Sequence, residues 1–303
     1  MTMHIDAAAT ETLLSWQGVM DAIVRGHALG RPQVDDTLFR RRDDSLLSRV
    51  ALIDGLGSLV KTATIFPANT DLGLRAVNGA VTLFSDSTGE IDATIDFHLL
   101  TRWKTAADSV LAASRLARPN PERILIIGSG TVAGSMVDAY GAIFPDASIT
   151  IWSRTHEHAV RLAERTTATA TEDLVTAVGA SDVICTATMS NRPVLRGRWL
   201  RPGQHVDLIG GYRSDMRETD DEAMARASIF VDSKHSAMDV GDIITPLSDK
   251  IITTRQLVDF SSIASGSFTR SSDDEITICK NAGGAHLDLM VARHMHDIVS
   301  TTP

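Results

Sequence analysis

The sequence predicts an α/β protein in which a Rossmann-type, doubly wound parallel sheet is joined to a second domain of α+β type. Residues 123–233 alternate between apolar strands and helices, which is typical of a parallel sheet covered on both faces. Residues 37–97 instead read as short strands joined by turns. The segment RPNP, residues 118–121, separates the two patterns and marks the clearest boundary.

The composition excludes several classes of protein. The chain has 303 residues, 43% of them hydrophobic, which is enough for one large domain or two ordinary ones. A net charge of −9 argues against a nucleic-acid partner. No apolar run approaches the roughly 18 residues of a membrane span, and we see no signal peptide. Cys185 and Cys279 lack metal or redox spacing, so we expect buried free thiols, no metal site and a cytoplasmic location.

The first half of the chain begins with a helix at residues 15–30, for which Ser15 can serve as the cap. Two hairpin signals follow, at the turn sequences DGLG and SDSTGE. Their strands are expected at residues 45–53, 58–66, 80–84 and 91–96. A strong helix over 101–117, with Thr101 as its cap, ends at the RPNP segment.

The second half repeats strand and helix. Strands are expected at residues 123–128, 148–152, 182–188, 204–210 and 228–233, with helices at 131–143, 155–165, 172–178 and 220–227. The pattern weakens over 245–275, where polar loops dominate. Residues 275–299 read as a strand, a Gly-Gly break and a long helix.

The stretch ILIIGSGTVA joins a predicted strand to a predicted helix through the pattern G-x-G-x-x-A. Gly128 permits the tight turn, Gly130 lets the backbone approach a pyrophosphate, and Ala133 keeps helix and strand close. The helix start, at Thr131 and Val132, offers unpaired N–H groups and a partial positive charge. We therefore expect a dinucleotide here; a plain strand–helix turn with incidental glycines is the alternative.

The end of the next strand indicates which dinucleotide binds. NAD-binding sheets usually place an acidic residue there, but this chain reads IWSRT. The guanidinium of Arg154 suits a 2′-phosphate, and Ser153 and Thr155 are further donors. We therefore predict NADPH as the cofactor, with NADH as a second option. The alternative is that Arg154 is a solvated surface residue.

Hydroxyl side chains follow the strand at 182–188. In doubly wound sheets ligands bind at the carboxyl ends of the strands, so we expect Thr186, Thr188 and Ser190 to approach the ribose or nicotinamide. The alternative is that they cap the next helix. In the segment NAGGAH, Gly283 permits close approach to the nicotinamide.

Seven sequence blocks occur in a specific order. They are VKTATIFPAN (60–69), SDSTGEIDATID (85–96), LTRWKTAADSVLAA (100–113), ILIIGSGTVA (124–133), TATMSNRPVL (186–195), LIGGYRSDMRETDDE (208–222) and CKNAGGAHLDL (279–289). Through them the chain resembles the ornithine cyclodeaminase/mu-crystallin family over nearly its whole length. The resemblance implies a Rossmann domain at 114–280, a substrate-binding and dimerisation domain formed by 1–113 and 281–303, and a homodimer. Family activities include ornithine cyclodeamination, alanine dehydrogenation, reduction of cyclic imino acids and hormone binding.

The resemblance assigns two lysines to the substrate. Lys61 matches the family's substrate-pocket lysine, which can bind a carboxylate or donate a proton. Lys104 stands where the family usually has arginine; it keeps the charge and loses the bidentate fork. The alternative for both is a lysine in solvent. His286 and Asp288 are candidates for proton supply, and neither the FRRR segment nor Arg49 is assigned as the family's second substrate arginine.

Tyr212 departs from part of the family. Cyclodeaminases and related alanine dehydrogenases carry aspartate there, and tyrosine is uncharged near neutral pH. The form RSDMRE resembles the ketimine-reductase branch instead. We therefore predict NADPH-dependent reduction of Δ1-pyrroline-2-carboxylate to L-proline, with Δ1-piperideine-2-carboxylate as a six-ring analogue. Two alternatives remain: ornithine cyclodeaminase or alanine dehydrogenase activity, and a non-catalytic NADPH-dependent binding protein like mu-crystallin.

Overall fold

The chain divides into two compact units in a computed structural model that describes residues 2–301. Unit 1 comprises Met1–Lys104 and Gly284–Pro303, and unit 2 comprises Thr105–Gly283. The boundary after residue 104 falls inside helix α3 (Phe97–Leu116), earlier than the 113/114 boundary that the resemblance suggests. The reason is that the later part of α3 belongs to unit 2, where the hydroxyl of Ser109 donates to the carboxylate of Asp207 in the sheet of that unit.

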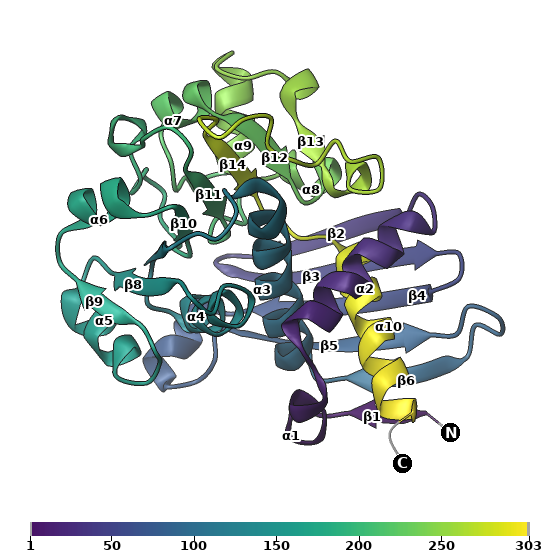
Figure 1. The fold of residues 1–303 in the computed structure, drawn as a ribbon. Helices are drawn as coiled ribbons and strands as arrows, with labels where there is room; N and C mark the ends of the chain where they lie inside the picture. Colours follow the sequence, from purple (N-terminus) through teal and green to yellow (C-terminus); the bar gives the residue numbers. More distant parts are fainter. Residues whose placement is uncertain (1, 302–303) are drawn as a thin grey trace. The chain divides into compact units, whose positions relative to one another are not determined.

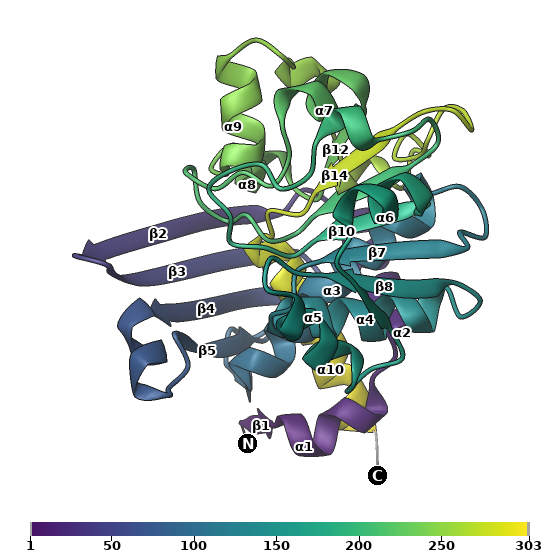
Figure 2. The ribbon, with the colours of Figure 1, turned by 90° about the vertical axis from the view of Figure 1, so that its left-hand side faces the viewer.

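Unit 1 is built on a six-stranded sheet in the order β1-β6-β5-β4-β3-β2. Its strands are β1 (Met3–Ile5), β2 (Gln33–Arg41), β3 (Asp44–Ile53), β4 (Gly57–Ile65), β5 (Val77–Phe84) and β6 (Ile91–Ile95). Neighbouring strands are antiparallel except β1 and β6, which are parallel. Both expected hairpins are present, and β2 to β5 run side by side (Figure 2). The sequence did not indicate β1 or β2.

Helices cover one face of this sheet. They are α1 (Ala7–Thr10), α2 (Trp16–Ala28), α10 (Ala285–Thr301) and the start of α3, with 3-10 turns η1 (Glu11–Leu13) and η2 (Pro67–Leu72). Helices α2 and α10 lie side by side across the strands (Figure 1). They can approach closely because Gly26 has no side chain; a Cβ at this position would lie 2.3 Å from Cγ of Met290. Ser15 caps α2 as predicted, accepting the N–H of Gly18 at 3.1 Å.

Arg293 fastens α10 to both hairpins. Its Nε donates to the carbonyl of Leu56 at 2.9 Å and its Nη2 to the carbonyl of Phe84 at 3.0 Å. Its Nη1 lies 2.8 Å from the carboxylate of Asp92. These hydrogen bonds attach the last helix of the chain to both hairpins.

Helix α3 begins before the cap that the sequence suggests. Asp96 accepts the N–H of Leu99 at 2.7 Å, so it serves as the cap. Thr101 lies inside the helix and its hydroxyl donates to the carbonyl of Phe97 at 2.7 Å. Both residue types can cap a helix, and burial of Phe97 favours the earlier start.

Unit 2 contains an eight-stranded sheet in the order β13-β12-β14-β11-β10-β7-β8-β9, with all neighbours parallel. Its strands are β7 (Arg123–Ile127), β8 (Ser148–Trp152), β9 (Thr169–Thr171), β10 (Val183–Thr186), β11 (His205–Leu208), β12 (Ser228–Val231), β13 (Val258–Asp259) and β14 (Thr277–Lys280). From β7 the chain builds β8 and β9 on one side and then returns to β10 on the other. The predicted Rossmann-type, doubly wound sheet is confirmed.

The helices of unit 2 are α4 (Thr131–Ile143), α5 (His156–Ala163), α6 (Leu174–Ala180), α7 (Asp221–Arg226), α8 (Lys234–Ala237) and α9 (Gly241–Ser248), with 3-10 turns η3 (Gly197–Trp199), η4 (Thr254–Gln256) and η5 (Phe260–Ser262). None of the helices within residues 2–301 combines the length and apolarity needed to cross a bilayer. Cys185 and Cys279 are buried free thiols, as predicted, and burial raises the pKa of both.

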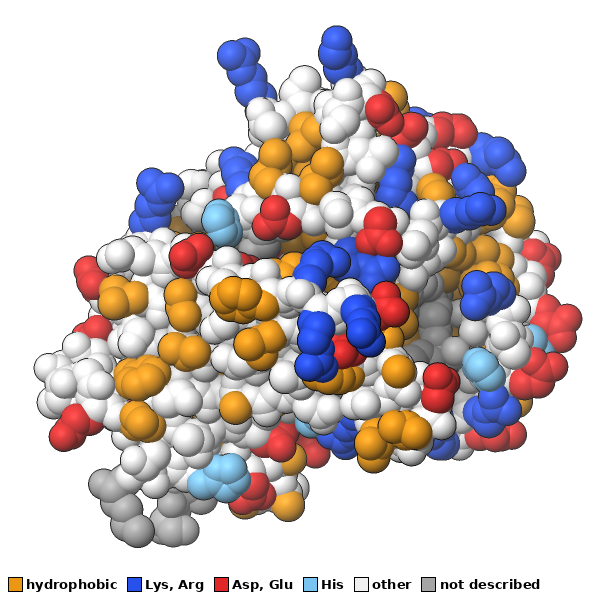
Figure 3. Space-filling view, turned by 180° about the vertical axis from the view of Figure 1, so that it is seen from behind, with side chains coloured by type: hydrophobic (Ala, Val, Ile, Leu, Met, Phe, Trp, Pro, Cys, Tyr) orange, Lys and Arg blue, Asp and Glu red, His pale blue; other side chains and the backbone are white. Residues whose placement is uncertain are grey.

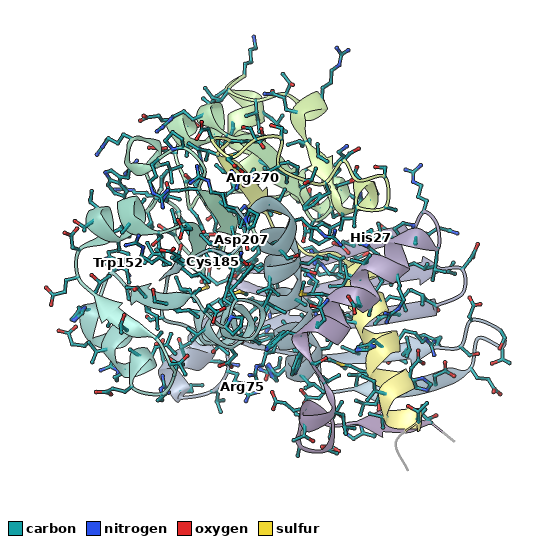
Figure 4. All side chains as sticks on the ribbon, in the orientation of Figure 1. His27, Arg75, Trp152, Cys185, Asp207 and Arg270 are labelled. Carbon is teal, nitrogen blue, oxygen red and sulfur yellow. The ribbon has the colours of Figure 1, made fainter. Side chains whose placement is uncertain are left out.

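A buried polar network occupies the middle of the unit 2 sheet. Asp207 on β11 accepts hydrogen bonds from Ser109 of α3 at 2.6 Å, from Tyr140 of α4, and from Asn281 at 2.7 Å. Burial raises the pKa of Asp207 to about 7, although these donors oppose the rise. Figure 4 shows Asp207 and Cys185 close together there. The network ties two helices and the end of β14 to the central strand.

Candidate functional site

The glycine turn after β7 requires glycine at its first position. Gly128 has a φ of +137°, and its N–H donates to the carbonyl of Trp152 at 2.8 Å. A Cβ on Gly128 would lie only 2.5 Å from the carbonyl oxygen of Ala187, which follows β10. The turn therefore leaves the end of β7 and packs against the backbone that follows β10. This is the point where the strand order reverses.

The start of α4 is exposed. Gly130 is its N-cap residue, and no side chain caps the helix. A Cβ on Gly130 would meet nothing within 4 Å, and Thr131 and Val132 are exposed. The first N–H groups of the helix therefore have no capping side chain as acceptor and carry a partial positive charge. These residues fit the pyrophosphate of a dinucleotide.

The three residues after β8 lie beside this turn. The hydroxyl of Ser129 donates to Oγ of Ser153 at 3.0 Å, which holds Ser153 against the glycine turn. Arg154 and Thr155 are exposed. The guanidinium of Arg154 makes no hydrogen bond or ion pair with another residue in the described part of the chain. It is therefore a cation that an anionic ligand could bind without displacing a protein partner.

Two of the hydroxyls at the end of β10 and in the segment after it donate to backbone carbonyls of the protein. The hydroxyl of Thr186 is fully buried and donates to the carbonyl of Asp207 at 3.4 Å. The expectation that its side chain approaches the cofactor is therefore wrong, because the last residue of β10 still points into the sheet. The hydroxyl of Ser190 donates to the carbonyl of Arg192 at 2.6 Å and stabilises its own turn.

Gly283 is needed for its backbone angle. Its φ is +77°, a conformation that favours glycine. Its N–H donates to Oδ2 of Asp232 at 2.6 Å, and the N–H of Ala282 donates to Oδ1 at 3.0 Å. These two N–H groups are therefore bonded to a buried carboxylate of the protein.

Thr188 is bound to Glu218, the last residue of the RSDMRE motif, for which the sequence gave no role. Oε1 of Glu218 accepts both the N–H and the hydroxyl of Thr188, each at 2.8 Å. Oε2 accepts the N–H groups of Gly210 at 2.8 Å and Gly211 at 3.2 Å. Glu218 thus joins the segments that follow β10 and β11. Its position within the RSDMRE motif was the only signal, and nothing local indicated these partners.

Lys61 lies on the inner, helix-covered face of the unit 1 sheet. Its side chain is 10% exposed, and Nζ donates to Oδ1 of Asp288 on α10 at 2.7 Å. Nζ also lies 5.1 Å from the ring centroid of Phe97. Burial lowers the pKa of Lys61, while the charge of Asp288 opposes that fall. The alternative of a solvent-facing lysine is wrong.

Two more cations act on this ion pair. Arg49 stands directly opposite Lys61 in the β3–β4 register, and its Nε lies 3.1 Å from the carboxylate of Asp36. Lys104 is buried on α3, so the solvated alternative is wrong for it as well. Burial would raise the pKa of Asp288, but the charges of Lys61, Lys104 and Arg49 outweigh it and lower that pKa. Three cations therefore lie around the carboxylate of Asp288.

The register of the sheet distinguishes the candidate arginines. Arg40, Arg41 and Arg42 of the FRRR segment are exposed, whereas Arg49 belongs to the cluster around Lys61. His286 is buried in the first turn of α10, with its ring edge-on to that of His27. Within residues 2–301, no group of three or more His, Cys, Asp or Glu side chains is arranged to hold a metal ion.

Tyr212 follows β11 and is 45% exposed. The guanidinium of Arg213 lies 5.8 Å from its ring centroid. Asp215 binds that guanidinium through both oxygens, at 2.9 and 3.0 Å. The carboxylate nearest to Tyr212 in the sequence is therefore neutralised by an arginine.

Comparison with known proteins gives consistent results. Residues 53–302 match the model of the ornithine cyclodeaminase/mu-crystallin family. The chain is 42% identical over 296 residues to Δ1-pyrroline-2-carboxylate reductase of Paracoccus denitrificans (strain Pd 1222), covering 95% of this chain and 94% of that protein. The structure is similar to that of Thermococcus litoralis Δ1-pyrroline-2-carboxylate reductase in complex with NADH and L-proline (TM-score 0.91, 25% identity, 99% and 98% of the chains). It is also similar to an archaeal alanine dehydrogenase dimer with bound NAD (TM-score 0.91, 26% identity, 99% and 96% of the chains).

Gly130→Ala tests the open helix start. The added methyl meets no protein atom within 4 Å, so the fold should be unaffected, but it fills the space in front of α4. We expect binding of the reduced dinucleotide to weaken by at least about tenfold, or about 1.4 kcal/mol. The measurement is a titration of cofactor fluorescence on the purified protein. Gly134→Ala, in the next turn of the same helix, is the control and should bind normally; equal affinities in all three proteins would contradict the assignment.

Proposed function

The chain belongs to the ornithine cyclodeaminase/mu-crystallin family, and on that premise we propose that it is an NAD(P)H-dependent reductase of cyclic imino acids. The substrate proposed first is Δ1-pyrroline-2-carboxylate, reduced to L-proline, with Δ1-piperideine-2-carboxylate as the six-membered analogue. Two relatives already described carry the name Δ1-pyrroline-2-carboxylate reductase. We further propose a cytoplasmic location, which the free thiols Cys185 and Cys279 suit.

The cationic cluster around Lys61 is the observation that carries the proposal. Lys61, Lys104 and Arg49 lie close enough together for all three charges to lower the pKa of Asp288. A buried cation is favoured by each carboxylate that binds it. A small ring acid supplies a carboxylate that these cations can bind. An uncharged substrate would lack this attraction.

Lys61 also suits the proton that the reaction needs. One of its three N–H donors is bonded to Asp288, so two remain for a substrate carboxylate or ring nitrogen. When bound, NAD(P)H supplies the hydride. The ring carbon accepts hydride more readily when the ring nitrogen bonded to it is protonated. The ammonium of Lys61 can donate that proton to the nitrogen. Asp288 has a lowered pKa and stays ionised, so it holds Lys61 in place and is not the proton donor.

Tyr212 disfavours the deaminating alternatives. A deaminase or amino-acid dehydrogenase must handle a substrate amine, for which an aspartate at this position would provide the charge. Tyrosine provides none near neutral pH, and Asp215 is already bound by Arg213.

A substrate panel tests the proposed reaction. Purified protein with Δ1-pyrroline-2-carboxylate and NADPH should consume the reduced cofactor and form proline. Lys61→Met should lower kcat/KM by about 100-fold or more, because it removes both charge and proton, while cofactor affinity stays unchanged. Absorbance of the reduced cofactor and chromatography of the product are the measurements. Ammonia release from ornithine or alanine with no imine reduction would overturn the proposal.

Asp288→Asn tests the role of the ion pair through pH. If protonated Lys61 is the active form, activity falls as pH rises through its pKa. Removing the carboxylate removes a charge that raises this pKa, so the alkaline limb of kcat/KM should move to lower pH. Asp297→Asn, which removes an exposed carboxylate of the same helix, is the control and should leave the limb in place. An unshifted limb in Asp288→Asn would exclude Lys61 as the titrating group.

For the cofactor we propose NADPH in preference to NADH, with both usable. The support is Arg154, an exposed guanidinium beside the glycine turn with no partner in the described part of the chain. Arg154→Ala should raise KM for NADPH by about tenfold or more, since a charged hydrogen bond is lost, and leave KM for NADH nearly unchanged. Arg161→Ala, an exposed cation on α5, is the control. An unaltered NADPH-to-NADH ratio in Arg154→Ala would refute the preference.

We also propose a homodimer formed through the face of the unit 1 sheet opposite α2 and α10. In the strand register this face carries large exposed apolar side chains: Phe39 (63% exposed), Leu46 (40%), Val50 (38%), Leu52 (42%) and Ile91 (45%). In the view from behind, hydrophobic side chains are exposed between polar ones (Figure 3). The support for the interface is that these five large apolar side chains share one face of the sheet.

Light scattering during size-exclusion chromatography tests the dimer. Wild-type protein should elute with twice the mass of one chain. Val50→Glu should elute as a monomer, since it places a charge at the centre of the face. Val175→Glu, at an exposed valine of unit 2, should remain dimeric. A monomeric wild-type protein, or a dimeric Val50→Glu variant, would count against this interface.

A further inference from the structure

Glu218 is a buried carboxylate with every acceptor position filled. Each oxygen accepts two hydrogen bonds: Oε1 from the N–H and hydroxyl of Thr188, and Oε2 from the N–H groups of Gly210 and Gly211. A backbone N–H can only donate, so a proton on this carboxyl group would displace one of these bonds. Burial raises the pKa of Glu218, the charge of Asp242 adds to the rise, and the charge of Lys280 and the hydrogen bonds from Thr188 oppose it. All four hydrogen bonds use Glu218 as the acceptor.

The surroundings leave this carboxylate no freedom to turn. Oδ1 of Asp242 accepts the N–H of Glu218 at 2.8 Å, and Oδ2 lies 3.4 Å from Nζ of Lys280, with both side chains fully buried. A Cβ on Gly210 would lie 2.0 Å from the carbonyl oxygen of Thr188. The segments after β10 and β11 are thus packed backbone to backbone around the carboxylate.

The hydrogen bond to Glu218 fixes the direction in which the Thr188 hydroxyl donates. A hydroxyl has one proton, and here it is donated to Glu218. Toward any other group, Oγ1 of Thr188 can therefore only accept. Thr188 directly follows Ala187, whose carbonyl contacts Gly128 in the glycine turn. The half-buried Thr188 is consequently an obligate acceptor at the edge of the cofactor turn.

We propose that Glu218 is a positioning residue that makes Thr188 an acceptor for a hydrogen-bond donor of the bound cofactor. Two groups of NAD(P)H have this chemistry: a ribose hydroxyl and the carboxamide N–H₂ of the nicotinamide. The proposal rests on the use of NAD(P)H in the proposed function and is independent of the imino-acid substrate.

Two substitutions at Thr188 test the acceptor. Thr188→Val keeps the shape and removes the oxygen, whereas Thr188→Ser keeps the oxygen. Titration of NADPH fluorescence without substrate should show about five- to tenfold weaker binding for Thr188→Val, the value of one hydrogen bond, and near wild-type binding for Thr188→Ser. Thr219→Val is the matched control, because its buried hydroxyl donates to the carbonyl of Leu195 and should affect stability only.

The reduced 3-acetylpyridine analogue distinguishes the two donors, because it lacks the carboxamide N–H₂. If the penalty of Thr188→Val disappears with this analogue, the donor is the carboxamide; if it persists, the donor is a ribose hydroxyl. Either result supports the acceptor role. Equal binding of both cofactors by Thr188→Val and wild type would overturn it.

A double-mutant cycle tests whether Glu218 acts through Thr188. Glu218→Gln should weaken cofactor binding in the wild-type background and add little in the Thr188→Val background, because the two changes affect one contact. Equal penalties in both backgrounds would reduce Glu218 to a structural residue and refute the proposal. Since no turnover is measured, a protein that fails to reduce the imine would refute the proposed substrate and leave this inference standing.

Discussion

The ion pair between Lys61 and Asp288 is the interaction on which the proposed chemistry depends. A lysine in the middle of a covered sheet would lose its proton to burial, and the carboxylate opposes that loss. The carboxylate is in place because α10 returns across the sheet and Arg293 fastens it to both hairpins. The charges of Arg49 and Lys104 also act on this pair. We propose that a carboxylate substrate binds among these cations.

In unit 2 the corresponding constraint is the distribution of backbone N–H groups at the carboxyl edge of the parallel sheet. Glu218 binds those of residues 210 and 211, and Asp232 binds those of 282 and 283. The start of α4 has no capping side chain, and the space before Gly130 is open. The protein thus bonds some of these donors to its own carboxylates and leaves the first N–H groups of α4 without a capping side chain. This division is consistent with a dinucleotide whose pyrophosphate binds at α4.

Local patterns in the sequence were sufficient for most of the fold. Alternating apolar strands and helices indicated the parallel sheet, and glycine-rich turns indicated both hairpins. Strand β2, QVDDTLFRR, has few apolar residues and forms because β3 offers it a partner. The start of α3 was misplaced because Asp96 and Thr101 are both capping types, and burial of Phe97 decides between them.

The site was harder to predict because its parts meet through long-range contacts. Lys61 carried a recognisable motif, but its pairing with Asp288 joins residues 227 positions apart. Arg49 could be distinguished from the FRRR segment only by the β3–β4 register. The hydroxyl of Thr186 was assigned to a ligand because its strand ends there, yet the side chain is buried and donates to the carbonyl of Asp207. Glu218 belongs to the RSDMRE motif, but its role could not be predicted because its partners lie in two other segments.

The claim that the cluster around Lys61 binds a ring carboxylate is tested most directly by calorimetry with pyrrole-2-carboxylate, a planar five-membered ring acid, and with its carboxamide. Both have the same shape, and only the acid is charged. With cofactor-saturated protein we expect the acid to bind at least about tenfold more tightly than the amide, and Lys61→Met to abolish that difference. Equal affinity of wild-type protein for acid and amide would contradict the claim.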